Sequence, residues 1–230
     1  MTSSDERAAA APLDGPRIDE SVEVERVQLD DDSWVDIARG WIAGADVLFR
    51  HLRDNVAWQT SRLFRYDHFV EERRLGAGWR PGRTLPHPVL ADVHRTLQHR
   101  YRAQFNGFSM IQYRNAGDGQ AFHRDTDMRW LDDTVIAILS LGARRPWLLR
   151  PRASRHAHAP GKGATHDLAP GNGDLLVMGG ACQANWEHSV PYLRTPVGMR
   201  ISLQWRHANR VGRPFHGASY DAPLHYSRPR

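Results

Sequence analysis

Three side chains of metal-binding types stand out by their spacing. His123 and Asp125, in the string FHRDTD, are two residues apart, so in an extended strand both leave the same face, about 6 to 7 Å apart. His188, in WEHSVP, follows among further predicted strands. Two histidines and one carboxylate on one face of an octahedron are typical of a non-haem Fe(II) site with open positions. Alone, His-x-Asp is a weak signal and is more typical of a polar strand edge.

Two arginines share one face of the predicted strand MRISLQWR. Arg200 and Arg206 are separated by an even number of residues, and their Cα atoms would stand roughly 20 Å apart. If they reach inwards, the gap between them is near that of a five-carbon dicarboxylate, and a carboxylate is the partner a guanidinium fork prefers. The competing interpretation is a solvent-exposed face shared with Ser202 and Gln204.

Short apolar runs after residue 107 predict the strands that must position these side chains. They are separated by Gly, Pro, Asp and Asn, and they read SMIQYR, TVIAILSLG, WLLRPR, DLLVMGG and MRISLQWR. TVIAILSLG is apolar on both faces, as a strand inside a sandwich or barrel would be. The expected fold class is therefore mainly β with N-terminal helices and a jelly-roll core.

Three helices are predicted before these strands. The first follows an N-cap at Asp32 or Ser33 and ends near Gly44. The second covers residues 46–56, and the third begins at Pro88 with an apolar stripe. Residues 57–87 lack a clean period and are expected to form loops and a hairpin. The apolar residues of the first helix recur at spacings of three and four: Trp34, Ile37 and Trp41.

Composition narrows the class of protein. The single cysteine, Cys182, excludes a disulfide framework and a multi-cysteine metal site, and favours a reducing cytoplasm. No apolar run approaches the roughly 20 residues that span a bilayer, and the first residues lack a signal-peptide core. We therefore expect a cytoplasmic protein with no membrane partner and no evident obligate protein partner.

The charge is unevenly distributed. The net charge is +5, but residues 1–36 carry 11 acids and 3 arginines while the remainder holds 15 acids and 28 bases. We expect a disordered acidic arm over residues 1–30, a helical region over 31–104, a strand-rich core over 105–206 and a basic tail over 207–230. The basic body favours a polyanionic partner.

Residues 105–206 together resemble the AlkB family of Fe(II)- and 2-oxoglutarate-dependent dioxygenases. The resemblance rests on several pieces in the family's order, which are more specific together than any one motif: FNGFSMIQYRNAGDGQAFHRDTD, TVIAILSLGARRPWLLRPR, LAPGNGDLLVMGGACQANWEHSVP and RISLQWR. It implies that residues 105–206 are a catalytic double-stranded β-helix core and that residues 31–104 are a helical and lid region for substrate recognition. It also implies Fe(II), 2-oxoglutarate and O2 as cofactor and co-substrates.

The resemblance also implies roles for individual residues. His123, Asp125 and His188 correspond to the iron ligands. Arg200 would pair with the distal carboxylate of 2-oxoglutarate, and Arg206 would lie near its metal-bound end.

Further positions show both agreement with the family and one departure. Tyr113 matches a tyrosine that hydrogen-bonds the co-substrate. Where the family usually has asparagine this chain has Ile111, so that hydrogen bond is missing or comes from another group such as Gln112. Asp127 matches an acid that reads the exocyclic amine of the damaged base, although a solvated turn carboxylate explains it as well.

The implied reaction is oxidative dealkylation of N-alkylated bases in DNA or RNA, with release of an aldehyde, succinate and CO2. An extruded base must lie against flat groups. The candidates in LFRYDHFVEERRLGAGW are Phe64, Tyr66, Phe69 and Trp79, all of which helix or hairpin packing could also explain.

Other interpretations remain open from the sequence. The protein could be an oxygenase acting on a protein or a small molecule, or a nucleic-acid-binding jelly roll without turnover. A second His-x-His pair, His156 and His158, is interpreted as a solvated loop. Cys182 is interpreted as a small buried residue, and Trp186 and Trp205 as core aromatics or neighbours of the site.

Overall fold

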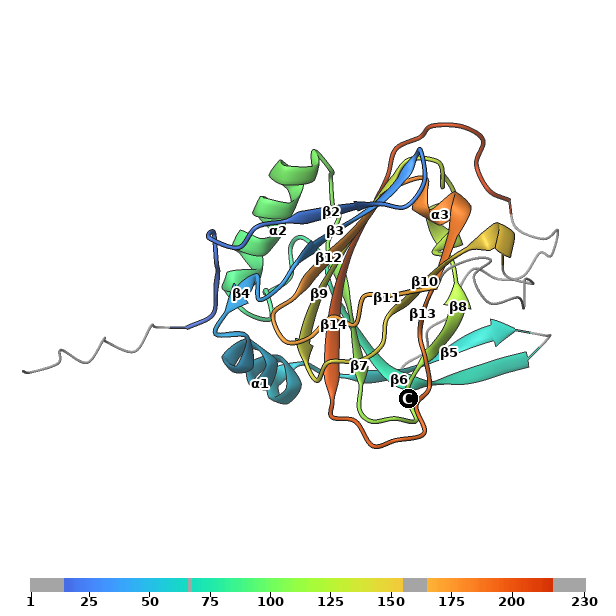
Figure 1. Cartoon of the computed structure of the whole chain (residues 1–230). Coiled ribbons are helices and arrows are strands. Elements are labelled where there is room, and N and C mark those ends of the chain that lie inside the picture. The colour runs from blue at the N-terminus through green and yellow to red at the C-terminus, as the bar shows by residue number, and fades with distance from the viewer. Residues whose placement is uncertain (1–14, 66–67, 155–164, 217–230) are drawn as a thin grey trace, which may run out of the picture.

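The computed structural model describes residues 15–65, 68–154 and 165–216, and these form mainly β-strands (Figure 1). The larger antiparallel sheet has the strand order β2-β3-β12-β9-β14-β7-β6-β5, and the smaller has the order β11-β10-β13-β8. The larger sheet contains β2 (Glu25–Gln28), β3 (Ser33–Ala38), β5 (Gln59–Arg65), β6 (His68–Trp79), β7 (Phe108–Tyr113), β9 (Thr134–Gly142), β12 (Leu175–Gly180) and β14 (Arg200–Ala208). The smaller contains β8 (Gln120–His123), β10 (Leu148–Pro151), β11 (His166–Asp167) and β13 (Trp186–Val190).

The two sheets face each other and enclose one of two apolar clusters. This inner cluster joins residues of both sheets, among them Tyr113 and Ile138 of the larger sheet and Leu149 and Trp186 of the smaller. Packing of two antiparallel sheets across a shared core is the jelly-roll arrangement, so the predicted fold class is confirmed.

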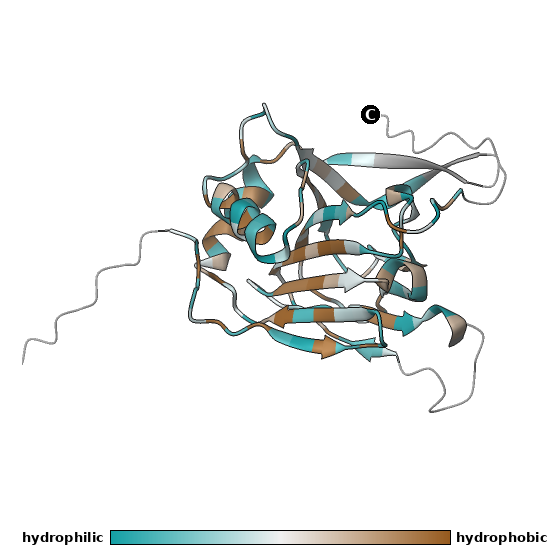
Figure 2. Cartoon of the chain, turned by 90° about the horizontal axis from the view of Figure 1, so that it is seen from above, coloured by the Kyte–Doolittle hydropathy of each residue, from teal (hydrophilic) through white to brown (hydrophobic). Residues whose placement is uncertain are grey.

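The second apolar cluster lies on the outer face of the larger sheet, under the helices α1 (Ala45–Asn55) and α2 (Val89–Tyr101). Along β9, Ala137 and Leu139 belong to this outer cluster, while Ile136 and Ile138 belong to the inner one. The two-sided apolar pattern of TVIAILSLG therefore reflects burial of both faces. In Figure 2, brown apolar residues run along the central strands, and the helices carry both brown and teal positions.

Both helices follow the sequence predictions closely. Gly44 precedes α1 with a positive φ of 71°, so it begins that helix rather than ending an earlier one. Pro88 precedes α2, where its missing N–H costs nothing because the first-turn donors are unpaired. None of the helices in the described residues is long and apolar enough to cross a membrane.

The predicted helix from residue 32 or 33 to 44 is wrong, because this segment contains β3. It pairs with β12 on one side and β2 on the other, and alternation sends Val35 and Ile37 into the inner cluster. The carboxylate of Asp36 is held by Arg26, 2.7 Å away, and by the hydroxyl of Tyr101. The helical spacing of the apolar residues was overridden by these long-range pairings.

The predicted disordered arm over residues 1–30 is wrong for its described part. Residues 15–30 contain β1 (Arg17–Ile18), which pairs with β4 (Ile42–Ala43), and β2, the edge strand of the larger sheet. The guanidinium of Arg26 lies 3.8 Å from the ring centroid of Trp34, which helps to hold this edge. Residues 1–14 lie outside the described residues.

The predicted boundary between residues 104 and 105 does not separate two packing units. β3 and β6 come from the region before it, yet both are hydrogen-bonded to strands from the region after it. The expected hairpin within residues 57–87 is present as β5 and β6. Of the predicted basic tail, residues 217–230 lie outside the described part.

Candidate metal and co-substrate site

The three candidate metal ligands meet at the smaller sheet. His123 ends β8 and stands directly opposite His188 of β13 in the antiparallel register, with ring centroids 4.2 Å apart. Asp125 follows two residues later, just before the short 3₁₀ helix η1 (Thr126–Met128). One ligand atom of each side chain lies within 4.8 Å of the others. The fold thus brings together residues that are far apart in the sequence.

The charges of these groups suit metal binding. Burial lowers the pKa of His188 to about 3, helped by neighbouring His123 and by two arginines, so its imidazole is neutral. Burial alone would raise the pKa of Asp125, but Arg206 and the two imidazoles hold it well below its usual range. A neutral imidazole and an ionised carboxylate are the states in which these side chains bind metal ions.

Neighbouring groups fix the orientation of the ligands. The backbone N–H of Asp125 donates to the side-chain oxygen of buried Gln183, 2.8 Å away. Nδ1 of His123 lies 2.9 Å from the carbonyl oxygen of Ala121, which leaves Nε2 directed towards Asp125 at 3.5 Å. The indole of Trp147 stacks on the ring of His188 at 5.4 Å. Such outer contacts orient metal ligands and tune their basicity.

This donor set fits an Fe(II) ion. Two imidazoles and one carboxylate leave half of an octahedron open, which is the arrangement used by non-haem iron oxygenases. Nδ1 of His188 is buried with no hydrogen-bond partner in the part of the chain that the structure describes. An unsatisfied buried nitrogen costs free energy unless a ligand or solvent compensates it.

Arg200 provides a buried cation for an anionic ligand. It is 1% exposed, and its Nη2 donates to Oγ of Ser140 at 2.9 Å. Nε and Nη1 are buried and have no hydrogen-bond partner among the described residues. Burial lowers the pKa of Arg200 to about 10, so it remains charged at neutral pH. The solvent-exposed interpretation of this strand face is therefore wrong for Arg200.

Arg206 is bonded within the protein. Its Nε lies 2.6 Å from Oδ2 of Asp125, and its Nη1 donates to Oγ of Ser109 at 2.8 Å. Its Nη2 donates to the side-chain oxygen of Gln204. Arg206 therefore positions the candidate ligand Asp125 and helps keep it ionised.

Tyr113 stands opposite Arg200 in the register of β7 and β14 and is almost completely buried. Ile111 shares the inner face of β7 with it, packed against the inner cluster. Gln112 alternates with Tyr113 and lies on the opposite face of the strand, so the idea that it replaces the family's asparagine is wrong.

Arg74 of β6 is a site residue that the sequence analysis did not identify. It is 9% exposed, forms an ion pair with Glu72 at 2.7 Å, and donates from Nη1 to the hydroxyl of Tyr113 at 3.4 Å. It also donates to the side-chain oxygen of Gln120. Within the string VEERRLG nothing distinguishes Arg74 from Arg73 except the strand register, which sequence alone leaves open.

A cavity of about 680 Å³ lies beside Arg206. Asp127 and Trp79 both line it, so the structure brings together these two predicted substrate residues. One face of Trp79 is occupied by Phe108, at 5.4 Å between ring centroids. The side chains of Phe64 and Phe69, and all of Tyr66, lie outside the described residues, as do His156 and His158.

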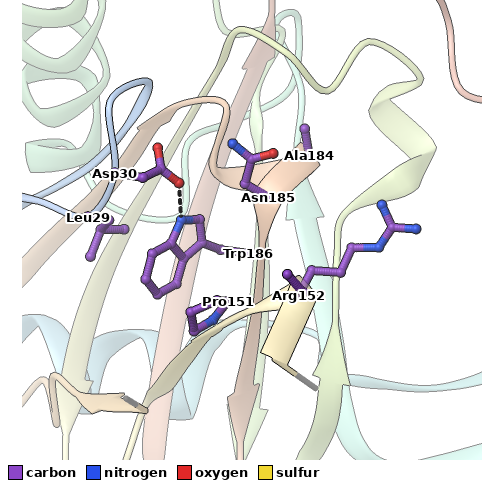
Figure 3. A pocket seen from close by; sticks show the side chains of 8 residues that line it. Leu29, Asp30, Pro151, Arg152, Ala184, Asn185 and Trp186 are labelled. Carbon is purple, nitrogen blue, oxygen red and sulfur yellow. Dashed lines mark hydrogen bonds between the residues drawn. The ribbon is translucent and has the colours of Figure 1, made fainter. Parts of the chain in front are cut away.

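The other singled-out residues have packing roles. Cys182 is fully buried in the short helix α3 (Cys182–Asn185), and burial raises the pKa of its thiol to about 12, as expected for an unreactive residue. Trp205 lies in the outer cluster. Trp186 donates from Nε1 to Asp30 at 2.7 Å and lines a separate cavity of about 690 Å³ that none of the three candidate ligands lines (Figure 3).

Comparison with known proteins gives both relatives and a fold neighbour. The alpha-ketoglutarate-dependent dioxygenase alkB homolog 3 of Homo sapiens is 28% identical over 177 residues, which are 70% of this chain and 61% of that protein. The DNA oxidative demethylase ALKBH2 of Homo sapiens is 26% identical over 179 residues, covering 71% of this chain and 69% of that protein. The match thus spans less than two thirds of the first of these relatives.

A solved structure shares the fold. The prolyl hydroxylase in complex with a hypoxia inducible factor peptide fragment from Trichoplax adhaerens has a TM-score of 0.54 and 14% identity, and covers 75% of this chain and 83% of that one. The family model of the 2OG-Fe(II) oxygenase superfamily matches residues 46–206, which include every candidate ligand. The chain therefore belongs to the 2OG-Fe(II) oxygenase superfamily and is AlkB-like within it.

Proposed function

We propose that this protein is an Fe(II)- and 2-oxoglutarate-dependent dioxygenase that removes alkyl groups from bases in DNA or RNA. The observation that carries the proposal is the convergence of His123, Asp125 and His188 within one barrel that also holds a buried, incompletely bonded Arg200. Iron, 2-oxoglutarate and O2 are the cofactor and co-substrates that membership of this superfamily implies.

The chain's own residues have distinct parts in this proposal. Arg200 would receive the distal carboxylate of 2-oxoglutarate, and buried Tyr113 would close the same end of the site. Arg206 holds Asp125 ionised and in place. Bound iron would supply oxidation of the keto acid to succinate and CO2, coupled to hydroxylation of an N-alkyl carbon that leaves as an aldehyde.

The substrate class rests on three further observations. The two human relatives are a dioxygenase of the alkB type and a DNA oxidative demethylase. The cavity beside Arg206 is lined by an aromatic ring, Trp79, and a carboxylate, Asp127, which are groups that suit a flat base with an exocyclic amine. Residues 37–230 carry the excess of basic side chains that attracts a polyanion.

The test is repair of a methylated oligonucleotide by purified protein with Fe(II), 2-oxoglutarate and O2. We expect restored adenine or cytosine together with equal amounts of succinate. Asp125→Ala should abolish both products, whereas Asp92→Ala, which changes an exposed helical carboxylate, should leave both unchanged.

Two outcomes would contradict the proposal in different ways. Succinate formation without base repair would indicate an oxygenase with a protein or small-molecule substrate. Oligonucleotide binding with no succinate at any iron concentration would indicate a binding protein without turnover.

A further inference from the structure

Two chain segments meet at the rim beside the candidate site. One follows Asp125 and continues through η1; the other follows β14 and passes over the end of the barrel near α3 (Figure 1). The backbone N–H of Phe215 donates to the carbonyl oxygen of Arg129 at 2.6 Å, and the side chain of Asn209 donates to Asp133 at 2.7 Å. The second segment is therefore attached to the first at two points.

Aromatic rings and guanidinium groups alternate where these segments meet. The guanidinium carbons of Arg129 and Arg210 lie 5.7 and 5.3 Å from the ring centroid of Trp130. The guanidinium carbon of Arg124 lies 5.2 Å from the ring of Phe215, which is 36% exposed. We call these five residues the rim patch.

Two of the three cations of the rim patch, Arg129 and Arg210, face solvent. Arg129 and Arg210 are exposed and have no ion-pair partner within the described residues. The nearby acids are engaged elsewhere: Asp133 accepts from Asn209, and Asp127 lines the cavity beside Arg206. Asp132 lies against the backbone of Gly212.

The backbone that presents these side chains is strained. Arg129 has φ 68° and ψ −50°, and the N–H of Trp130 donates to the carbonyl oxygen of Met128 at 2.9 Å. This is a γ-turn with positive φ, which is rare and costs free energy for a residue with a side chain. Strain of this kind persists mainly at functional sites.

We propose that the rim patch binds the nucleic-acid strand next to the base held in the cavity. This inference rests on the proposed function and adds where the rest of the strand lies. Stacking on aromatic rings and guanidinium contacts to phosphates are the two interactions that bind single strands without reading their sequence. Trp130 is three residues from Asp127, so it lies within about 10 Å of the cavity lining, the span of a few nucleotides.

The test measures how tightly the protein and its rim-patch variants bind a single strand. Binding of an unmodified labelled oligothymidine to iron-free protein is measured by fluorescence anisotropy over a range of salt concentrations. We expect Trp130→Ala to weaken binding about tenfold and Trp130→Phe to keep most of it, because stacking needs only a flat ring. Arg210→Gln should weaken binding several-fold and reduce the salt slope by about 1.

Matched controls lie outside the rim patch. Arg50→Gln changes an exposed arginine on α1, and Tyr192→Ala removes an exposed aromatic side chain, so both should bind as the unchanged protein does. For the loaded enzyme, Trp130→Ala should raise KM for a long methylated strand but not for a methylated trinucleotide. Substrate-independent succinate release should be unchanged.

The outcomes separate this inference from the proposed function. If the unchanged protein repairs bases and the rim-patch variants bind long strands normally, the inference is overturned and the proposed function stands. Weaker strand binding by the variants without any base repair would support the rim patch while the repair function fails. A third outcome would also overturn the inference: the variants bind polyglutamate as weakly as they bind the oligonucleotide, and Trp130→Phe is as defective as Trp130→Ala. The surface would then bind acidic peptides. If Trp130→Ala does not fold by circular dichroism, Arg210→Gln and Arg129→Gln decide the result.

Discussion

The two ends of β14 carry arginines on the same face of the strand, and the protein surrounds them in opposite ways. Arg206 is bonded to the carboxylate of Asp125 and to two further side-chain oxygens. Arg200 is buried more deeply, but it donates to one hydroxyl, and two of its nitrogens have no hydrogen-bond partner in the described chain.

This difference supports the proposed roles of Arg206 as a positioning residue and of Arg200 as a binding residue. A buried cation that is already paired has little left to offer a ligand, and removal of its partner leaves an uncompensated charge. A buried cation without an anion costs folding free energy, which an anionic ligand can recover. We therefore propose that one end of the barrel is preorganised around a metal ligand and that the other is completed by a carboxylate from outside.

The largest effect is expected from Asp125→Ala, which removes a candidate metal ligand and the carboxylate that is paired with Arg206. Loss of a direct ligand should weaken Fe(II) binding and lower turnover by more than about 100-fold, because even outer-shell changes cost up to that much. Metal titration followed by succinate assay measures both. Undiminished turnover would exclude Asp125 from the ligand set.

Arg200→Met should raise KM for 2-oxoglutarate roughly 100-fold, since two charge-assisted hydrogen bonds are lost. In protein without co-substrate the same change should increase the free energy of unfolding by about 1–3 kcal/mol, because a buried unpaired cation is removed. Urea denaturation and steady-state kinetics check the two parts, with Arg50→Met as the exposed control. An unchanged KM would show that the co-substrate lies elsewhere.

Arg206→Met should lower the free energy of unfolding, whereas Arg200→Met should raise it. In metal-free protein it leaves the buried carboxylate of Asp125 without its cation, at a cost of about 3 kcal/mol. The pKa of Asp125 is held low in the folded state, so the stability it contributes is present at neutral pH and lost as the pH falls. The variant should therefore lose less stability on acidification than the unchanged protein. If the variant and the unchanged protein have equal unfolding curves at neutral and at acidic pH, Arg206 does not stabilise the ionised form of Asp125.

Gln183→Leu should weaken metal binding about tenfold by releasing the backbone N–H of Asp125. Gln104→Leu, at an exposed position, is the matched control. Metal affinity equal in both variants would mean that this hydrogen bond does not orient the ligand.

The smallest effect is expected at the co-substrate end from Ile111→Asn. An amide on the inner face of β7 should lower KM for 2-oxoglutarate about threefold, the worth of one neutral hydrogen bond. It should also lower the unfolding temperature, because an apolar contact is lost. A higher KM would show that Ile111 packs directly against the bound co-substrate.

Sequence prediction succeeded where a pattern was local. Apolar runs located β9, β12 and β14 to within a residue or two, and residues 46–56 and Pro88 marked two helices. It failed at β3, whose apolar residues fit a helical period but pair with β2 and β12 instead. Neighbouring strands supplied by distant parts of the chain decided that element.

In the candidate site, too, local features were predictable from the sequence and long-range contacts were not. The residue types and even spacings of His123 and Asp125, and of Arg200 and Arg206, are properties of the chain itself, because side chains alternate along any strand. Their convergence with His188, the approach of Arg74 to Tyr113 and the contrasting surroundings of the two arginines depend on which strands lie side by side. Strand order and register are set by packing across the whole barrel, so only the tertiary structure decided them.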